Sequence, residues 1–259
     1  MMMRKLADFA LPIFVFFAYL LMYTPIIVLV IFSFHEGKTP HDWQGFSLKW
    51  YRQLFDSVEI LGALKNSLIV AFSSVALSIT MGLFFVFYGA KNILRSFLFA
   101  FYGSLAAPEV VVAVGLLSFL SFFSVPLGLT SLVAGHTLVA LSYVTPLLYS
   151  RFTSLDYSIT EASLDLGATQ WQTFTKIIIP LLSPAIMGAA LLVFIVSLDD
   201  FIISFFCAGA STVTLPMYIF AVIRAGATPV VNALSTLLLV MTSLAVLVFT
   251  LFRVKTRVF

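Results

Sequence analysis

Apolar residues in this chain gather in long runs with almost no charged positions. A helix needs about 20 apolar residues to cross the ~30 Å hydrocarbon core of a bilayer, because each residue advances it by about 1.5 Å. Six runs of about this length can be drawn along the sequence, and they cover residues 11–34, 66–90, 97–124, 131–150, 185–206 and 230–252. The pattern predicts an all-α membrane protein with six transmembrane helices in a single domain of residues 1–259.

Helix-breaking residues and short segments between the apolar runs support this division. The stretch from Ser96 to Ser150 is long enough for two spans, and Pro126-Leu127-Gly128 divides it. The segment Leu215–Ile223 is too short for a further span and suggests a short or re-entrant helix. The basic start followed by an apolar run resembles a signal peptide, but the run is too long and no small-residue cleavage site follows. We therefore expect an uncleaved first span.

Composition excludes most soluble classes of protein. Of the 259 residues, 61% are hydrophobic and 10% are charged, with a mean hydropathy of +1.11. Soluble domains carry about 25% charged residues. A soluble enzyme, a nucleic-acid-binding protein and a disordered chain are therefore not expected. A single cysteine, Cys207, excludes an intrachain disulfide and a cysteine metal cluster.

Basic residues predict the orientation in the membrane, because cytoplasmic loops are enriched in lysine and arginine. With six spans, nine of the 14 basic residues fall on the side of the two termini: Arg4, Lys5, Lys91, Arg95, Arg151, Lys176, Arg253, Lys255 and Arg257. The other five fall on the opposite side: Lys38, Lys49, Arg52, Lys65 and Arg224. Both termini and the loop 151–184 are then cytoplasmic, and the loop 35–65 is extracytoplasmic.

The extracytoplasmic loop holds a candidate interfacial helix. Ser47 is a suitable residue to cap its start. Lys49 and Arg52 would form the polar face, and the apolar face would consist of Leu48, Tyr51, Leu54 and Phe55. This pattern predicts a short helix lying on the outer surface of the membrane.

The cytoplasmic loop predicts a helix, a turn and a second helix. Thr160 suits a helix start, and Gly167 suits a helix end. Apolar residues recur at helical spacing after the turn, and Pro180 is expected to end the second helix: Trp171, Phe174, Ile177 and Ile178. Two interpretations follow from the residues alone. The loop either packs on its own bundle or docks to a cytoplasmic partner.

The loop resembles a signature of ABC importer permeases. Five positions match the EAA loop of that family: Glu161, Ala162, Gly167, Ile177 and Pro180. Ser163 and Ile179 depart mildly from it. The resemblance implies the type I (MetI-like) permease fold, in which this loop inserts into a groove of the ATP-hydrolysing subunit. Glu161, Asp165 and Gly167 would be contact positions here.

A finer resemblance covers most of the chain. The spermidine/putrescine permeases of this family are similar to it in the segments 23–29, 46–51, 66–68, 108–111, 197–201 and 232–236. Glu109 stands where that group usually has aspartate. The resemblance implies a polyamine importer of the bacterial inner membrane, with a second permease, two ATPase subunits and an extracytoplasmic binding protein. Similar permeases carry iron or aminophosphonates, so another small solute is the alternative.

Three carboxylates lie within the predicted spans, namely Glu109, Asp199 and Asp200. Each costs about 2.5–3.5 kcal/mol at mid-membrane unless it is satisfied, and no lysine or arginine lies in these spans. Glu109 is about 18 Å along its span and Asp199 about 21 Å along its own at 1.5 Å per residue, so they share a depth. A layer of negative charge suits a substrate with several ammonium groups, whose methylene stems could lie against Tyr102 or Tyr143.

Each of these residues also has a structural interpretation. Glu109 follows Pro108 and could accept hydrogen bonds from backbone amides where the helix restarts. Asp199 and Asp200 are about 100° apart on a helix, so both cannot face one path equally. Asp200 could cap a helix break or contact the second permease. We expect His136 to be a helix-packing or loop residue and not a ligand.

Motifs for nucleotide binding, nucleophilic catalysis and metal binding are missing from the sequence. It has no glycine-rich phosphate loop, serine nucleophile elbow or histidine-rich metal motif. We therefore expect a transport subunit that is not an enzyme and binds no cofactor or metal, with ATP and magnesium on the partner ATPase. A stand-alone secondary transporter is the alternative from another class, but its inverted repeats are not evident.

Overall fold

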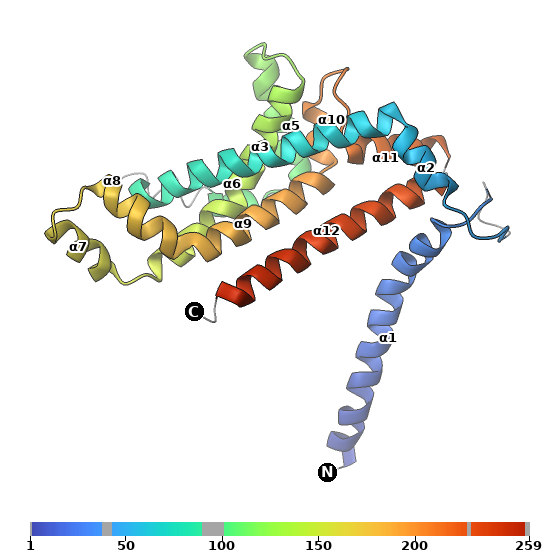
Figure 1. Cartoon of the computed structure of the whole chain (residues 1–259), viewed down its shortest axis with the longest axis horizontal. Helices are drawn as coiled ribbons and strands as arrows, with labels where there is room; N and C mark the ends of the chain where they lie inside the picture. Colours follow the sequence, from blue (N-terminus) through green and yellow to red (C-terminus); the bar gives the residue numbers. More distant parts are fainter. Residues whose placement is uncertain (1, 38–42, 90–100, 227–228, 257–259) are drawn as a thin grey trace. The chain divides into compact units, whose positions relative to one another are not determined.

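A computed structural model describes residues 2–37, 43–89, 101–226 and 229–256, and all regular elements in these ranges are helices (Figure 1). This confirms the all-α prediction. The helices are α1 (Met2–Phe32), α2 (Lys49–Asp56), α3 (Val58–Gly89), α5 (Glu109–Phe122), α6 (Leu129–Thr153), α7 (Tyr157–Asp165), α8 (Gln170–Thr173), a π-helical turn η1 (Phe174–Ile178), α9 (Ile179–Asp199), α10 (Ile202–Cys207), α11 (Leu215–Ala225) and α12 (Pro229–Thr256).

Five of the described segments are long and apolar enough to cross a membrane: Leu11–Phe32, Val58–Gly89, Leu129–Thr153, Gln170–Asp199 and Pro229–Leu251. They correspond to five of the six predicted spans. The predicted span 97–124 differs, because its helix is broken at residues 106–108 and α5 has only 14 residues. Pro108 causes the break, since proline has no N–H and disfavours a helical conformation in the residue before it. Residues 97–100 lie outside the described part.

The predicted span 185–206 ends earlier than expected. Helix α9 stops at Asp199, Asp200 has an extended backbone (φ −71°, ψ 111°), and α10 follows. At its other end, Pro180 does not end the preceding helix as predicted, since Gln170–Asp199 is continuous. The π-helical turn η1 directly precedes the proline, and Ile179 N–H donates to the carbonyl of Phe174. This wider turn lets the helix pass Pro180, which lacks an N–H.

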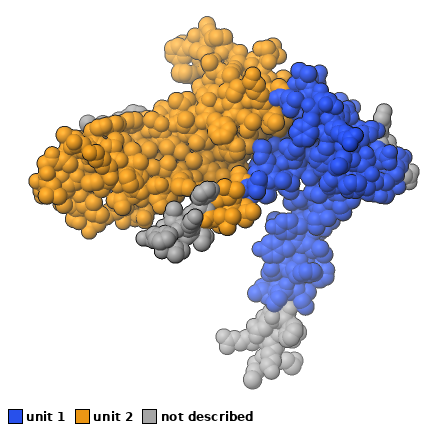
Figure 2. Space-filling model, viewed as in Figure 1, with its two compact units in different colours: residues 1–61, 219–244 blue, residues 62–218, 245–259 orange. Residues whose placement is uncertain are grey.

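The described chain divides into two compact units (Figure 2), formed by residues 1–61 with 219–244 and by residues 62–218 with 245–259. The second unit has two apolar clusters. One joins α3, α6, η1 and α9 around Val144, Phe174 and Leu182. The other joins α3, α5, α6 and α10 around Ala113, Leu132 and Ile203. The single-domain organisation stays a prediction.

Helix α3 separates two ends of the second unit. Near its start, Ser67 Oγ accepts a hydrogen bond of 2.8 Å from Leu215 N–H, beside the 208–214 loop. Near its end, the ring of Phe84 stacks on Trp171 in α8, with centroids 6.3 Å apart. Seventeen residues separate Ser67 from Phe84, or about 26 Å of helix. The loop 208–214 and the α7–α8 segment therefore contact α3 at points about 26 Å apart, a separation close to the thickness of the hydrocarbon core (Figure 1).

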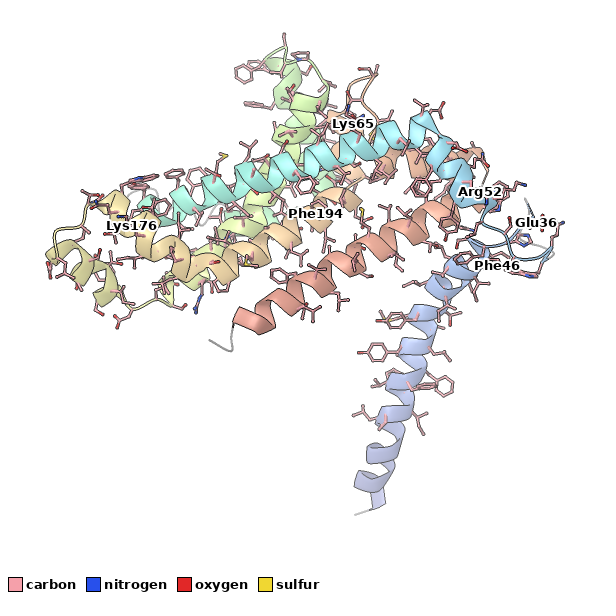
Figure 3. All side chains as sticks on the ribbon, viewed as in Figure 1. Glu36, Phe46, Arg52, Lys65, Lys176 and Phe194 are labelled. Atoms are coloured by element: carbon pink, nitrogen blue, oxygen red, sulfur yellow. The ribbon has the colours of Figure 1, made fainter. Side chains whose placement is uncertain are left out.

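The segment between α1 and α3 is held by a compact set of contacts in the first unit. Trp50 is buried and its Nε1 donates to the carbonyl of His35 at 2.6 Å. A backbone bridge pairs His35 with Phe46, and the N–H of Glu36 donates to the carbonyl of Gly45, the residue before Phe46, at 3.1 Å (Figure 3).

These contacts correct the predicted face of α2. Its buried residues are Trp50 and Leu54, whereas Leu48 and Phe55 are exposed. The indole hydrogen bond turns the helix so that Trp50 lies inside. The N-cap position of α2 is Leu48 and not Ser47 as predicted, but Ser47 Oγ still accepts the N–H of Lys49, the first residue of the helix, at 3.2 Å.

Two glycines of the second unit give a first prediction. A Cβ on Gly209 would lie 2.3 Å from the carbonyl oxygen of Leu127, whereas a Cβ on Gly115 would have no atom within 4 Å. Gly209→Ala should therefore destabilise the protein by about 1–3 kcal/mol, because backbone must move. Gly115→Ala should be neutral or stabilising by up to about 1 kcal/mol, because alanine favours helix. Thermal unfolding in detergent measures both, and equal midpoints would contradict the prediction.

Candidate functional site

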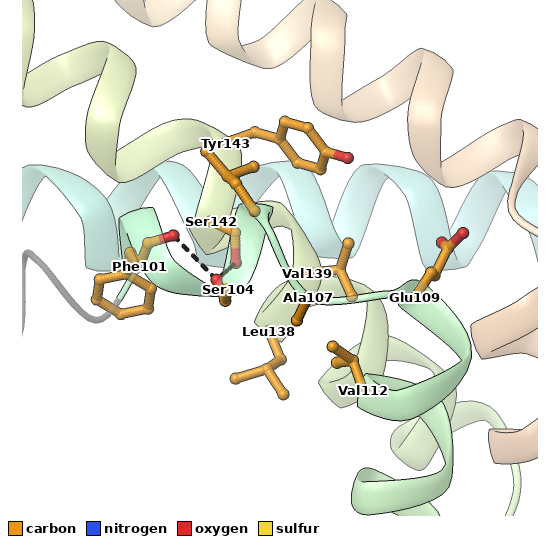
Figure 4. A pocket seen from close by; sticks show the side chains of 10 residues that line it. Phe101, Ser104, Ala107, Glu109, Val112, Leu138, Val139, Ser142 and Tyr143 are labelled. Atoms are coloured by element: carbon orange, nitrogen blue, oxygen red, sulfur yellow. Dashed lines mark hydrogen bonds between the residues drawn. The ribbon is translucent and has the colours of Figure 1, made fainter.

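A cavity of about 310 Å³ lies in the second unit between the residues preceding α5, α5 itself and α6. Its walls are mostly apolar, and the polar atoms come from Ser104, Ser142, Tyr143 and Glu109 (Figure 4). The hydroxyls of Ser104 and Ser142 hydrogen-bond to each other. Figure 4 shows this pair toward one end of the lining and Glu109 toward the other. A cavity of this kind can hold an apolar stem with a polar or cationic end.

Glu109 is exposed at the first position of α5. Pro108 breaks the helix before it, and so the carboxylate stands at the edge of the cavity. Within the described part of the chain it accepts no hydrogen bond from a backbone amide. The structural interpretation of Glu109 as a cap for the restarting helix is therefore not supported by this geometry.

Asp199 and Asp200 face different surroundings. Asp199 is exposed at the last position of α9, while Asp200 is 9% exposed. Asp200 Oδ1 accepts the N–H of Ile203 at 3.0 Å, and Oδ2 is 3.5 Å from His136 Nε2. Asp200 therefore caps the first turn of α10, as its structural interpretation predicted, whereas its place in the substrate path stays a prediction. Ala113 in α5 and Ile203 in α10 belong to one apolar cluster. Glu109 lies four residues before Ala113, and Asp199 and Asp200 lie four and three residues before Ile203, so the three carboxylates lie in one region.

Of the two predicted tyrosines, only Tyr143 lines the cavity. Tyr102 is 40% exposed and is not among the lining residues, because Phe101, Ser104 and Leu105 form the face of its short helical segment that lines the cavity. Sequence reasoning did not identify Ser104 and Ser142. Their signal was weak, since single serines recur in most of the apolar runs.

The segment 151–184 contains α7 and α8 as predicted, with one correction at its start. Asp156, not Thr160, caps α7, and its Oδ1 accepts Ser158 N–H at 3.0 Å. Thr160 is buried one turn later. The hydrogen bonds from the backbone and side chain of Ser158 lower the pKa of Asp156. The cap is therefore complete at neutral pH, and its contribution disappears only as the pH falls below the ordinary aspartate range through this lowered pKa.

The turn after α7 depends on Gly167, which has φ +87°. Its N–H donates to Leu164 and the N–H of Ala168 donates to Ser163, which is a Schellman ending. Thr169 then caps α8 in a reciprocal pair with Gln172. This confirms the predicted helix end at Gly167.

The segment both packs on its own chain and presents a free face. Trp171 and Phe174 contact Phe84 in α3. The opposite face exposes most of the predicted coupling positions, namely Glu161, Ala162, Asp165 and Gly167. Ile177 is half-buried and Pro180 is exposed, and both lie in the continuous helix that leads into α9. Packing on its own chain is therefore confirmed for one face, and docking of the other face to a partner stays a prediction.

Comparison with known proteins decides the family. No model of a known protein family matches the chain. The spermidine/putrescine transport system permease protein PotC of Haemophilus influenzae is 36% identical over 241 residues, which cover 91% of this chain and 92% of PotC. The chain belongs to the PotC/PotI permease family. Escherichia coli PotC is 34% identical, with 88% of each chain covered, and the putrescine transport system permease protein PotI of E. coli is 33% identical, with 84% and 81% covered.

Solved structures agree on the fold of this permease. A bacterial ABC transporter that imports the acidic polysaccharide alginate matches with a TM-score of 0.74 and 16% identity, covering 97% of this chain and 95% of that chain. The alginate transporter in complex with a pentasaccharide-bound periplasmic protein matches with a TM-score of 0.66 and 18% identity, covering 96% and 92%. The permease therefore has the helical fold of ABC importer subunits, as the loop 151–184 predicted.

Proposed function

We propose that this permease is a transmembrane subunit of an ATP-driven importer of polyamines such as spermidine and putrescine. The observation that carries the proposal is that the exposed Glu109 and Asp199 lie in one region with Asp200, beside a largely apolar cavity. No lysine or arginine occurs in residues 101–150 or 179–207, so these carboxylates lack a basic partner in the helices that carry them. The printed names of the relatives support the same substrate class.

The chemistry of the site suits a polyamine. An ammonium group would pair with Glu109 or Asp199 through charge-assisted hydrogen bonds. The methylene stem would lie along the apolar wall that includes Val112 and Val139, and a second amine could meet the hydroxyls of Ser104 and Ser142 or the ring of Tyr143. An acidic or neutral solute would leave the carboxylates unsatisfied in a membrane of low dielectric constant.

The proposed assembly follows from the family. This subunit would pair with a second permease, two ATPase subunits that hold ATP and magnesium, and an extracytoplasmic binding protein in the bacterial inner membrane. Six spans of the MetI-like type are proposed, with the third broken at Pro108. The basic residues favour cytoplasmic termini. The α7–α8 segment and the loop 208–214, which contact α3 at points about 26 Å apart, would then face the ATPase and the binding protein.

Coupling would run through the free face of α7. Closure of the ATPase pair on ATP would pull on Glu161, Asp165 and the turn at Gly167, and this would shift α9 because Gln170–Asp199 is one continuous helix. Asp199 lies at the far end of that helix. A movement at the ATPase would therefore reach the carboxylate site along a rigid element, and the permease would alternate between outward and inward states.

Reconstitution tests the proposal. Liposomes containing this permease with its second permease and ATPase should accumulate labelled spermidine when ATP and the loaded binding protein are present, and omission of the ATPase should abolish accumulation. Unlabelled putrescine should compete, whereas ferric iron and an aminophosphonate should not. Accumulation by the isolated chain, or competition only by iron or the aminophosphonate, would contradict the proposed function.

A further inference from the structure

A buried histidine occupies the point where α9 gives way to α10. His136, in α6, is 4% exposed. Its Nδ1 lies 2.8 Å from Ser197 Oγ in α9, and its Nε2 lies 3.1 Å from Ser204 Oγ in α10. One imidazole therefore hydrogen-bonds to side chains on both sides of the break, and all three residues are buried.

The carboxylate of Asp200 completes this network. Its Oδ2 is 3.5 Å from His136 Nε2, and its Oδ1 accepts the N–H of Ile203. Asp200 thus caps the first turn of α10 while it faces the histidine. A small hollow lined by His136, Ser197, Asp200 and Tyr143 lies at the same place. Because Tyr143 also lines the larger cavity, the network borders the candidate substrate site.

The network decides where two adjacent acids point. A regular helix through this point would turn Asp200 only about 100° from Asp199. Instead the chain leaves the helix at Asp200, which is buried against His136, and Asp199 remains exposed. Buried polar networks are strongly directional, because each member loses its partner when another is removed. Removing the imidazole would leave Ser197, Ser204 and Asp200 without the group that joins them.

We propose that His136 is a positioning residue, which holds the break between α9 and α10 so that Asp200 stays inside and Asp199 stands in the path. It does not touch the substrate. Its contribution to transport rests on the proposed function above, whereas its effect on the position of Asp199 does not.

Chemical labelling tests the positioning directly. In the assembled transporter carrying Cys207→Ala, a single cysteine is introduced as Asp199→Cys, and its reaction with a cationic methanethiosulfonate is timed. Adding His136→Leu should slow this reaction about fivefold or more, the change expected when a net hydrogen bond is lost. His136→Gln should keep the original rate, because its amide supplies both a donor and an acceptor.

A matched reporter separates positioning from general loosening of the fold. Ser211→Cys, in the exposed loop after α10, should react at the same rate with and without His136→Leu. An unchanged rate at position 199, or an equal change at both positions, would overturn the proposal. If His136→Leu does not assemble, Ser204→Ala decides, because it removes one hydrogen bond and should give a smaller slowing at position 199 only.

Spermidine uptake by the His136 variants distinguishes the positioning role from the proposed function. In the chain that retains Asp199, His136→Leu should raise the KM for spermidine uptake more than it lowers the maximal rate, and His136→Gln should restore the KM. If the labelling changes as expected but even the unmodified transporter carries no polyamine, the proposed function fails and the positioning role stands. If uptake is normal in His136→Leu with unchanged labelling, the positioning role fails and the proposed function stands.

Discussion

Spermidine uptake is expected to fall about tenfold to a hundredfold when Glu109 or Asp199 is replaced by alanine. The magnitude follows from losing a charge-assisted hydrogen bond, worth about 1.5–3 kcal/mol, when an ammonium group passes the site. Glu109 lines the cavity and accepts no hydrogen bond in the described part of the chain, so its removal leaves no protein donor without a partner. The loss should therefore appear in uptake and not in the amount of folded permease.

The comparison is uptake of labelled spermidine at equal expression in the assembled transporter. Glu109→Asp should retain most of the uptake, because it keeps the charge at the cavity edge. Glu59→Gln is the matched control, since Glu59 is an exposed carboxylate in the first turn of α3 that does not line the cavity. Normal uptake by both alanine variants, or an equal loss with Glu59→Gln, would contradict the assignment of Glu109 and Asp199 to the substrate path.

Replacement of Gly167 by valine is expected to reduce coupling to the ATPase about tenfold. Gly167 has φ +87°, a conformation that costs about 1–3 kcal/mol for ordinary residues and is least accessible to β-branched ones. A Cβ there would have no atom within 4 Å, so the backbone and not crowding is responsible. The end of α7 would reorient and carry Glu161 and Asp165 away from their contact positions. Co-purification of the ATPase and its substrate-stimulated hydrolysis should both fall about tenfold, the effect of about 1.4 kcal/mol.

Two substitutions make this prediction specific. Gly167→Asn should keep most of the coupling, because asparagine tolerates a left-handed backbone better than other residues. Gly62→Ala should have no effect, since Gly62 is helical and its added Cβ would also have no neighbour within 4 Å. Full coupling in Gly167→Val would show that the turn is not needed for ATPase contact.

The turn at Gly167 was predicted from local chemistry, and the break at Pro108 could have been, although residues 97–124 were predicted as one span. Both residues restrict or permit backbone angles by their own covalent structure, and the helix after Gly167 could be expected from apolar spacing alone. Pro180 shows the limit of that reasoning. A proline was expected to end the helix, but a π-helical turn before it leaves Gln170–Asp199 continuous. Such a turn depends on how Phe174 and Ile178 pack in the core, which no local pattern reveals.

The candidate site also has features that the sequence predicts and features that it does not. Three acids in apolar runs without basic partners were visible in the sequence, because a charge in a membrane is costly wherever it lies. Their common depth could be estimated from helical rise. The sequence could not show which of the two adjacent acids is exposed. That depends on His136, which precedes Asp199 and Asp200 by 63 and 64 positions, and on serines from two further helices.

The order of residues by itself determined the class of this protein: its apolar runs require a bilayer, and residues 161–180 carry the family signature. Tertiary packing alone decided that Asp200 turns inward, that Ser104 and Ser142 meet across a cavity, and that one helix joins the coupling segment to Asp199. The physical reason is the distance along the chain over which each interaction acts. Hydrophobicity and backbone preference act within a few residues, whereas hydrogen bonds between helices depend on where distant segments come together.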